Sequence, residues 1–378
     1  MNKTLLGGLA PHLFLKRHWH KQPLLIRSAI PDWRDILTPK QLFTLARHEL
    51  CEARLVVATG NTPEVHYGPL PAGVFHDLPS TNWTLLVQGV NHVLPAARSL
   101  LKRFSFLPYA RLDDLMVSYA APGGGVGPHF DSYDVFLLQG KGQRRWQVSA
   151  QTDLELIADS ELKILRKFRP EGTCVLDPGD MLYLPPRFAH DGVALDACLT
   201  YSIGFRSPDY ETLKAQFLAY LDDTIHIDGR YGDPDLVPQR HPAELGERMI
   251  GEIIGALSSI RWDRSELIAF LGRNLSEPKS HIVLQPPRAI TYREFSRRAR
   301  ASGLEVHPAL PLLFHGAHAF LNGEVFALQK SERKTIIALA DLRRLSARDT
   351  RHADAAALRS LYSWYRSGYI NIGEWGRM

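Results

Sequence analysis

The sequence predicts an α+β chain with three parts: a β-sandwich or barrel, a helical region and a small unit of winged-helix type. Between about residues 82 and 207, short apolar runs alternate with Gly and Pro, which is typical of antiparallel strands joined by turns. Helical periodicity replaces this pattern after Pro208. Nearer the C-terminus, Asn322-Gly323 separates two short apolar runs, a strong signal for a type I′ hairpin. We therefore divide the chain into 1–207, 208–275 and 276–378.

The first part begins with mixed elements and continues as strands. We expect a short strand at 22–26, a helix at 38–48 and a strand at 55–58. Thr38 is the expected N-cap of that helix, with Pro39 at its first helical position. Further strands are expected at 114–120, 133–139, 144–149, 173–177, 180–185 and 198–205.

The region from 208 to 275 is expected to contain three helices, at 210–223, 243–260 and 265–271. The second has an apolar face that must be buried, so we expect these helices to pack on the barrel or on a second copy of the chain. That face consists of Leu245, Ile250, Ile253, Ile254 and Leu257. In the last part, helices are expected at 292–301, 335–340 and 354–367.

Composition indicates a folded, soluble protein of a reducing compartment. Hydrophobic residues make up 45% and charged residues 22% of the 378 positions, and no apolar run is long enough to cross a membrane. The N-terminal segment lacks the order of a secretory signal. The three cysteines, Cys51, Cys174 and Cys198, are few and odd in number, which argues against a disulfide framework. We expect a cytoplasmic location and no membrane association.

Positive charge is concentrated near the C-terminus. From Ile290 onwards there are 14 Lys/Arg and 8 Asp/Glu, a local net charge of +6, against +5 for the whole chain. Such an excess suits an acidic partner, and nucleic acid or a ribonucleoprotein is one interpretation. A solvated helical surface is the other, and the sequence leaves both open.

The segment at 121–146 holds the most informative chemistry. It contains His129-Phe130-Asp131, and residues two apart on a strand point to the same face. One imidazole and one carboxylate could therefore reach one metal, and His190 in DPGDMLYLPPRFAHDG offers a third ligand. Two histidines and one carboxylate form the facial triad of non-haem Fe(II) oxygenases, which leaves positions open for a bidentate 2-oxo acid and for O₂.

A His-x-Asp pair alone is weak evidence, because the chain has three. The other two are His226/Asp228 and His352/Asp354, which lie in loop or helical sequence. Only His129/Asp131 follows a Gly-rich turn, precedes an apolar strand and has a downstream partner histidine. This context favours the metal interpretation over an ordinary polar histidine.

The runs GGGVGPHFDSYDVFLLQGKGQRRW and DPGDMLYLPPRFAHDGVA closely resemble the bacterial ribosomal oxygenases. The resemblance implies a double-stranded β-helix, the jelly-roll barrel of cupin and JmjC proteins, followed by a helical dimerisation region and a C-terminal winged-helix domain. It implies an enzyme that uses Fe(II), 2-oxoglutarate and O₂ to hydroxylate an arginine of ribosomal protein sixteen of the large subunit. It also implies a homodimer whose partner is that ribosomal protein.

The same resemblance assigns roles to residues. His129, Asp131 and His190 match the metal ligands, and Arg144 matches the arginine that binds the distal carboxylate of 2-oxoglutarate, with Ser118 beside it. Arg145 is the rival. Strand alternation places Arg144 with the more apolar set, so we expect Arg144 to face the interior.

A substrate pocket is expected next to the metal. Asp114, Met116 and Ser118 share one strand face, and Tyr133 shares the face of His129 and Asp131. Asp114 could pair with a guanidinium while Met116 and Tyr133 flank its aliphatic stem, and family pockets are built similarly, with Ser202 added. Plain core packing is the alternative for Met116 and Tyr133.

Two other functions stay open at this point. A JmjC-type demethylase would use the same iron chemistry on a methylated lysine or arginine. A non-catalytic module would combine a cupin shell with a winged helix that binds nucleic acid, although it would have no reason to keep the triad and Arg144 together.

Overall fold

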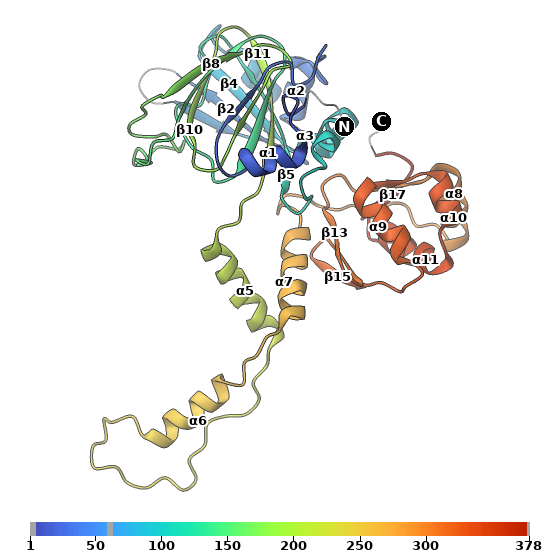
Figure 1. Cartoon of the computed structure of the whole chain (residues 1–378). Coiled ribbons are helices and arrows are strands. Elements are labelled where there is room, and N and C mark those ends of the chain that lie inside the picture. The colour runs from blue at the N-terminus through green and yellow to red at the C-terminus, as the bar shows by residue number, and fades with distance from the viewer. Residues whose placement is uncertain (1–4, 59–62, 376–378) are drawn as a thin grey trace.

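The computed structural model describes residues 5–58 and 63–375 of the chain. Its N-terminal part consists of two antiparallel sheets that face each other (Figure 1). The larger sheet runs in the order β1 (Leu24–Ile26), β9 (Met181–Leu184), β6 (Asp134–Gln139), β11 (Cys198–Phe205), β5 (Leu112–Ala120), β4 (Trp83–Gln88), β2 (Glu52–Val57) and β3 (Glu64–Tyr67). The smaller sheet is β10 (Ala189–Ala194), β7 (Arg144–Ser149) and β8 (Gly172–Leu176). This arrangement confirms the predicted barrel.

Alternation along the strands separates an outer core from the barrel interior. On β11, Leu199, Tyr201 and Ile203 join the large outer core, whereas Cys198 belongs to a small cluster inside the barrel. Because successive side chains point to opposite faces, Thr200 and Ser202 face the interior as well. The interior is therefore lined by a mixture of apolar and hydroxyl-bearing side chains.

Helices at the N-terminus cover the outer face of the larger sheet. Phe14 of α1 (Pro11–Arg17) is buried against Tyr183 and Phe136, with ring centroids 4.9 and 5.5 Å apart. The predicted helix after Thr38 is α2 (Pro39–Leu45), which begins with a capping box between Thr38 and Gln41 and ends three residues earlier than expected. The remaining short helices of this part are η1 (Ala72–Phe75), α3 (Val90–Val93), α4 (Pro95–Leu101) and η2 (Lys102–Phe104).

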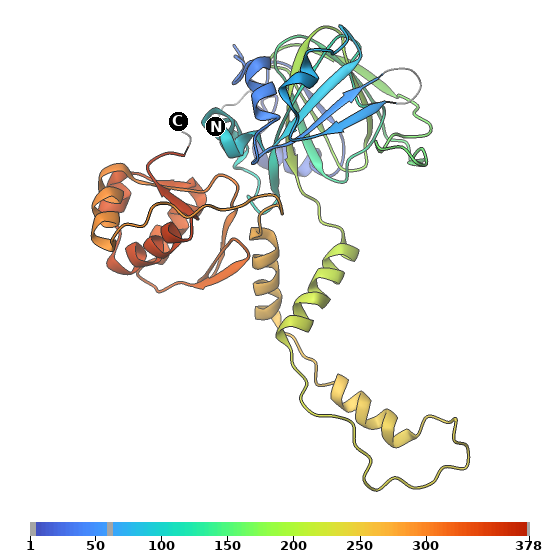
Figure 2. The ribbon, with the colours of Figure 1, turned by 180° about the vertical axis from the view of Figure 1, so that it is seen from behind.

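The helical region leaves the barrel rather than packing on it. Figures 1 and 2 show α6 (Glu247–Leu257) extending away from both the barrel and the C-terminal domain. The helix before it, α5 (Tyr210–Thr224), leaves the barrel and packs against Phe270 of the third helix, with the rings of Phe217 and Phe270 5.1 Å apart. None of the residues of α6 is buried, and the helix is shorter than the predicted 243–260. The third helix, α7 (Arg264–Ser276), packs on the strands of the C-terminal domain. By its packing, α7 belongs with the C-terminal domain, whereas the sequence-based division between residues 275 and 276 placed nearly all of this helix in the helical region.

The C-terminal domain has its own core. Its helices are α8 (Tyr292–Ser302), α9 (Arg333–Leu342), α10 (Ala347–His352) and α11 (Ala355–Arg366). Its strands are β12 (Leu304–Val306), β13 (Leu312–His315), β14 (His318–Leu321), β15 (Glu324–Ala327), β16 (Arg344–Leu345) and β17 (Ile370–Ile372). Asn322 and Gly323 have positive φ angles of 54° and 72° between β14 and β15, as a type I′ hairpin requires.

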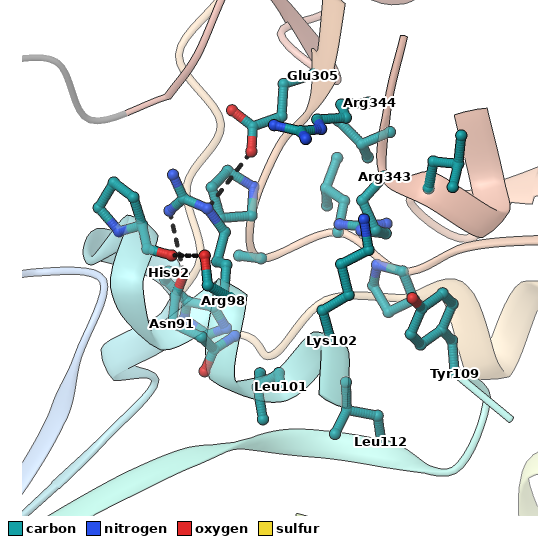
Figure 3. Close-up of a pocket in the computed structure, with 18 of the residues that line it drawn as sticks. Asn91, His92, Arg98, Leu101, Lys102, Tyr109, Leu112, Glu305, Arg343 and Arg344 are labelled. Carbon is teal, nitrogen blue, oxygen red and sulfur yellow. Dashed lines mark hydrogen bonds and ion pairs between the residues drawn. The ribbon is translucent and has the colours of Figure 1, made fainter. Parts of the chain in front are cut away.

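Polar contacts join this domain to the barrel around a cavity of about 290 Å³ (Figure 3). Arg98 of α4 lies 3.4 Å from a carboxylate oxygen of Glu305 and donates to the carbonyl of Trp375 at 2.7 Å. Tyr109 donates to the carbonyl of Asp341 at 3.2 Å. Both sides of the junction therefore contribute partners, which holds the two domains in one relative orientation.

Two further expectations concern membranes and cysteines. Among the described helices, none combines the length and the apolar composition of a membrane span. Cys51, Cys174 and Cys198 are all free thiols, and Cys51 and Cys198 are buried.

Glycines in two helices provide a matched test of this packing. A Cβ at Gly272 of α7 would overlap the buried ring of Phe320 on β14, whereas Gly255 of α6 has open space around it. We expect Gly272→Ala to lower the free energy of unfolding of the C-terminal domain by about 1–3 kcal/mol through overpacking. Gly255→Ala should leave it unchanged or raise it slightly, because Ala favours helix. Chemical denaturation of both variants measures the difference, and equal stability of the two would show that α7 is not tightly packed there.

Candidate active site

The three predicted metal ligands come from two segments that meet at the edge of the smaller sheet. His190 lies on β10, opposite Val148 of β7. His129 forms an isolated antiparallel bridge with His190, with N–H···O distances of 2.9 and 2.8 Å in the two directions. Contrary to the expectation that His129 and Asp131 share a regular strand, both precede β6 in an irregular segment. The bridge, rather than strand alternation, sets their positions.

The side chains of His129, Asp131 and His190 converge. One ligand atom from each lies within 4.8 Å of the others, and Nε2 of His190 is 3.7 Å from Oδ2 of Asp131. Both imidazoles use Nδ1 for a backbone carbonyl, that of Gly127 for His129 and that of Phe188 for His190, each at 2.9 Å. These contacts orient the rings and leave Nε2 of each ring free to face the common point. A backbone carbonyl is a usual partner for the second ring nitrogen of a metal-binding histidine.

The surroundings keep His190 in the form that binds a cation. Burial and the neighbouring His129 lower the pKa of His190 to about 4, so its imidazole is neutral near pH 7. Burial and the nearby Asp131 carboxylate raise the pKa of Tyr133, which keeps the phenol protonated. Two imidazoles and one carboxylate with no fourth protein ligand in the described cluster fit Fe(II) better than a closed structural zinc site.

Arg144 and Arg145 lie on opposite faces of β7. Arg144 is buried with 5% of its surface exposed, whereas Arg145 is exposed. The guanidinium of Arg144 lies 5.7 Å from the ring centroid of Trp146, and that ring lies 5.9 Å from the ring of His190. Arg144 therefore stands inside the barrel, on the side of the triad.

The buried guanidinium of Arg144 lacks partners. Its Nε and Nη2 atoms have no hydrogen-bond partner within the described part of the chain. Because an unpaired charge in such a place costs several kcal/mol, the arrangement calls for an anion. A carboxylate fits a planar guanidinium with two parallel hydrogen bonds, so this residue suits the distal carboxylate of 2-oxoglutarate.

Hydroxyl groups line the interior across the sheet. Ser118 is buried on β5 and pairs in register with Thr200 of β11. Thr200 donates to the side chain of Gln139 at 3.1 Å, so that hydroxyl already has an acceptor. Thr200 and Gln139 were not among the predicted site residues. The alternation of side chains along β11, which places Thr200 on the same face as Ser202, could have identified Thr200.

Three of the predicted substrate residues lie along one stretch of β11. Ser202 lies opposite Met116 in the pairing of β11 with β5. A Cβ at Gly204 would lie 3.7 Å from the ring of Tyr133, so that ring lies next to the end of β11. Met116 is only partly buried, in a small cluster separate from the outer core.

Asp114 has a partner that the sequence did not suggest. Its Oδ2 atom accepts from Nζ of Lys279 at 2.9 Å and from the backbone N–H of Gly89 at 3.2 Å. Lys279 lies in the segment between α7 and α8, where no motif distinguishes it. Only the docking of the C-terminal domain brings it to β5.

Comparison with known proteins follows the same division of the chain. A family model described as a JmjC domain matches residues 99–213, and one described as a ROXA-like winged helix matches residues 259–371. The second match begins before α7, in agreement with the packing of that helix. Both domain types expected from the sequence are therefore present.

Relatives match nearly the whole chain. The ribosomal protein uL16 3-hydroxylase of Escherichia coli (strain K12) is 32% identical over 361 residues, which cover 94% of this chain and 96% of that protein. An X-ray structure of E. coli YcfD has a TM-score of 0.85 at 32% identity and covers 96% of this chain and 98% of that one. A structure of YcfD, a ribosomal oxygenase, in complex with cobalt and 2-oxoglutarate has a TM-score of 0.81 at 31% identity over the same shares. The chain belongs to the ribosomal oxygenase family of JmjC-type oxygenases.

Proposed function

We propose that this protein is a 2-oxoglutarate- and Fe(II)-dependent oxygenase that hydroxylates an arginine side chain of ribosomal protein uL16. The observation that carries the proposal is the pairing of an open facial triad with the unpaired, buried guanidinium of Arg144. A metal with open positions and an anion receptor inside one barrel match the two ends of 2-oxoglutarate. The uL16 substrate follows from the named activity of the E. coli relative.

Each residue of the site has a task. His129, Asp131 and His190 would hold Fe(II), and Arg144 with Ser118 would hold the distal carboxylate of 2-oxoglutarate. When bound, Fe(II) and 2-oxoglutarate would supply, together with O₂, the oxidising power that inserts one oxygen atom into an unactivated C–H bond. The bonds from Nδ1 to the carbonyls of Gly127 and Phe188 keep both imidazoles in one tautomer and orientation.

The substrate side chain would enter past Tyr133 and Met116. These two side chains would flank its aliphatic stem, while Asp114 and Ser202 receive the guanidinium. Tyr133 stays protonated because of burial and Asp131, so it offers a neutral hydroxyl beside the metal ligands. Positioning of the target carbon and exclusion of water are thus the contributions of the protein.

We further propose a homodimer formed through α5 and α6. The apolar face of α6 is exposed to solvent at Ile254 and Leu257, which are 57% and 58% exposed. Leu245, which the sequence placed on this face, lies before the start of the helix and is 72% exposed. An amphipathic helix needs a partner for such a face, and α6 has none within the described chain. A second copy presents the same face and supplies that partner.

The C-terminal domain would contribute a weak contact with ribosomal RNA. Its outer helix α8 exposes four arginines, Arg293, Arg297, Arg298 and Arg300. Arg297 and Arg298 pair with Glu294, which leaves a net positive surface. A uL16 substrate would also agree with a cytoplasmic location.

The mass of uL16 tests the proposed function. Incubation with the enzyme, Fe(II) and 2-oxoglutarate should add the mass of one oxygen atom to uL16 and convert 2-oxoglutarate to succinate. We expect His190→Ala to abolish the mass gain, since it removes a metal ligand, and likewise His129→Ala and Asp131→Ala. His226→Ala is the matched control, because His226 belongs to another His-x-Asp pair and is exposed. Loss of a methyl group instead would indicate a demethylase, and no reaction with any protein would favour a binding module.

Arg144 and Arg145 provide a second matched pair. Arg144→Ala should raise the KM for 2-oxoglutarate by about tenfold to a hundredfold, since hydrogen bonds between charged groups contribute about 1.5–3 kcal/mol. Arg145→Ala should change it little, because its side chain is exposed. Steady-state succinate formation gives both values. Equal effects would remove Arg144 from the cosubstrate site.

The dimer is tested on α6. The double variant Ile254→Asp/Leu257→Asp should be monomeric, because two carboxylates cannot be buried in an apolar interface. Glu252→Gln is the control, since Glu252 pairs with Arg248 at 3.2 Å on the charged side of the helix. Light scattering at micromolar concentration measures the mass of each. A monomeric wild type would reject the dimer.

A further inference from the structure

We propose that Lys279, which precedes the winged-helix core, is a positioning residue of the substrate pocket that holds Asp114 ready for the substrate guanidinium. This inference rests on the proposed function, because it assumes that Asp114 receives the substrate. It assigns the C-terminal domain a part in substrate binding.

Lys279 is surrounded by carboxylates at the start of β5. Its Nζ atom lies 2.9 Å from Oδ2 of Asp114 and 3.6 Å from Oδ1 of Asp113. A third carboxylate, that of Glu52 on β2, is 3.7 Å away. The side chain of Lys279 is 24% exposed and that of Asp114 only 5%, so the closest of these pairs is shielded from solvent. This ammonium is the nearest cation to the buried carboxylate of Asp114.

Among residues 5–58 and 63–375, the hydrogen bonds to the carboxylate of Asp114 are all on one oxygen. Lys279 and the backbone N–H of Gly89 both donate to Oδ2. Two donors from different elements fix the plane of the carboxylate. The other oxygen, Oδ1, is thereby left for a further donor, and a guanidinium can supply one without displacing Lys279.

The sum of the charges around Lys279 leaves room for one additional cation. The group contains three carboxylates, those of Asp113, Asp114 and Glu52, and two permanent cations, Lys279 and Arg206, which pairs with Asp113 at 2.9 Å. With these five groups ionised the sum is −1, which one substrate guanidinium would neutralise. His281 also lies in this group, 3.7 Å from Glu52.

Lys279 also favours the charged form of Asp114 against the effect of burial. Burial raises the pKa of Asp114, and the charge and hydrogen bond of Lys279 act against that shift. Burial by itself would lower the pKa of Lys279, but the charges of Asp114 and Asp113 outweigh it and raise that pKa. Without Lys279, Asp114 would be a buried carboxyl that favours its neutral form and attracts a guanidinium less.

The C-terminal domain determines where Lys279 lies. It follows α7, which ends next to the barrel (Figures 1 and 2). The last residue of α7, Ser276, accepts a hydrogen bond from the N–H of Gly323 in the hairpin turn at 3.2 Å. The carbonyl of Lys279 in turn accepts from the N–H of Ile282 at 2.9 Å. The lysine is therefore presented by a segment anchored on the winged-helix hairpin.

The test uses the full-length protein and a fluorescent uL16 peptide that contains the unmodified target arginine. We expect Lys279→Met to weaken peptide binding about tenfold, as loss of a charged partner from a buried site does. Iron binding and the KM for 2-oxoglutarate should stay at wild-type values, which a general loss of structure would not allow. Lys279→Arg, which keeps the charge, should restore most of the affinity. Lys334→Met, on the exposed surface of α9, is the control.

A double-mutant cycle with Asp114→Asn completes the experiment. If Lys279 acts through Asp114, Lys279→Met should have little further effect on peptide binding in the Asp114→Asn background. Additive effects, unchanged binding in Lys279→Met, or parallel loss of peptide, iron and 2-oxoglutarate binding would each overturn the inference. A wild-type enzyme that neither binds nor hydroxylates any uL16 peptide would overturn the proposed function first, and this inference with it.

Discussion

The two backbone hydrogen bonds between His129 and His190 are the constraint on which the site depends. They join a segment before β6 to strand β10, far apart in the sequence, and so bring the imidazoles to the same point. The Nδ1 contacts with Gly127 and Phe188 use carbonyls from the same two segments. Ring position and ring orientation thus come from one local structure, and Asp131 needs only to follow His129 by two residues.

The barrel interior imposes a second requirement, which concerns charge. Arg144 lies in an apolar lining near Trp146, and part of its guanidinium has no partner among the described residues. A fold would gain stability by replacing such a group with an apolar one. An anionic cosubstrate would complete the pairing, so we propose that function rather than stability accounts for this residue.

The third feature is the dependence of the pocket on a second domain. The carboxylate of Asp114 belongs to the barrel, but its closest cation, Lys279, belongs to the segment that the C-terminal domain anchors. Contacts such as Arg98 with Glu305 keep the two domains together. A winged helix in this protein is therefore positioned to shape the pocket as well as to present its exposed arginines to a partner.

The sequence by itself determined the parts that depend on local physics. Strand alternation predicted that Arg144 faces inwards and Arg145 outwards, and Asn322-Gly323 predicted the hairpin because few other residues accept its positive φ angles. The motif around His129 and His190 identified the three candidate ligands that the fold brings together, but the irregular path of His129–Asp131 depends on a bridge to a distant strand that no spacing reveals. Lys279 lay beyond sequence reasoning for the same reason: a single lysine without a motif gains its role only when a separate domain docks and places it beside Asp114.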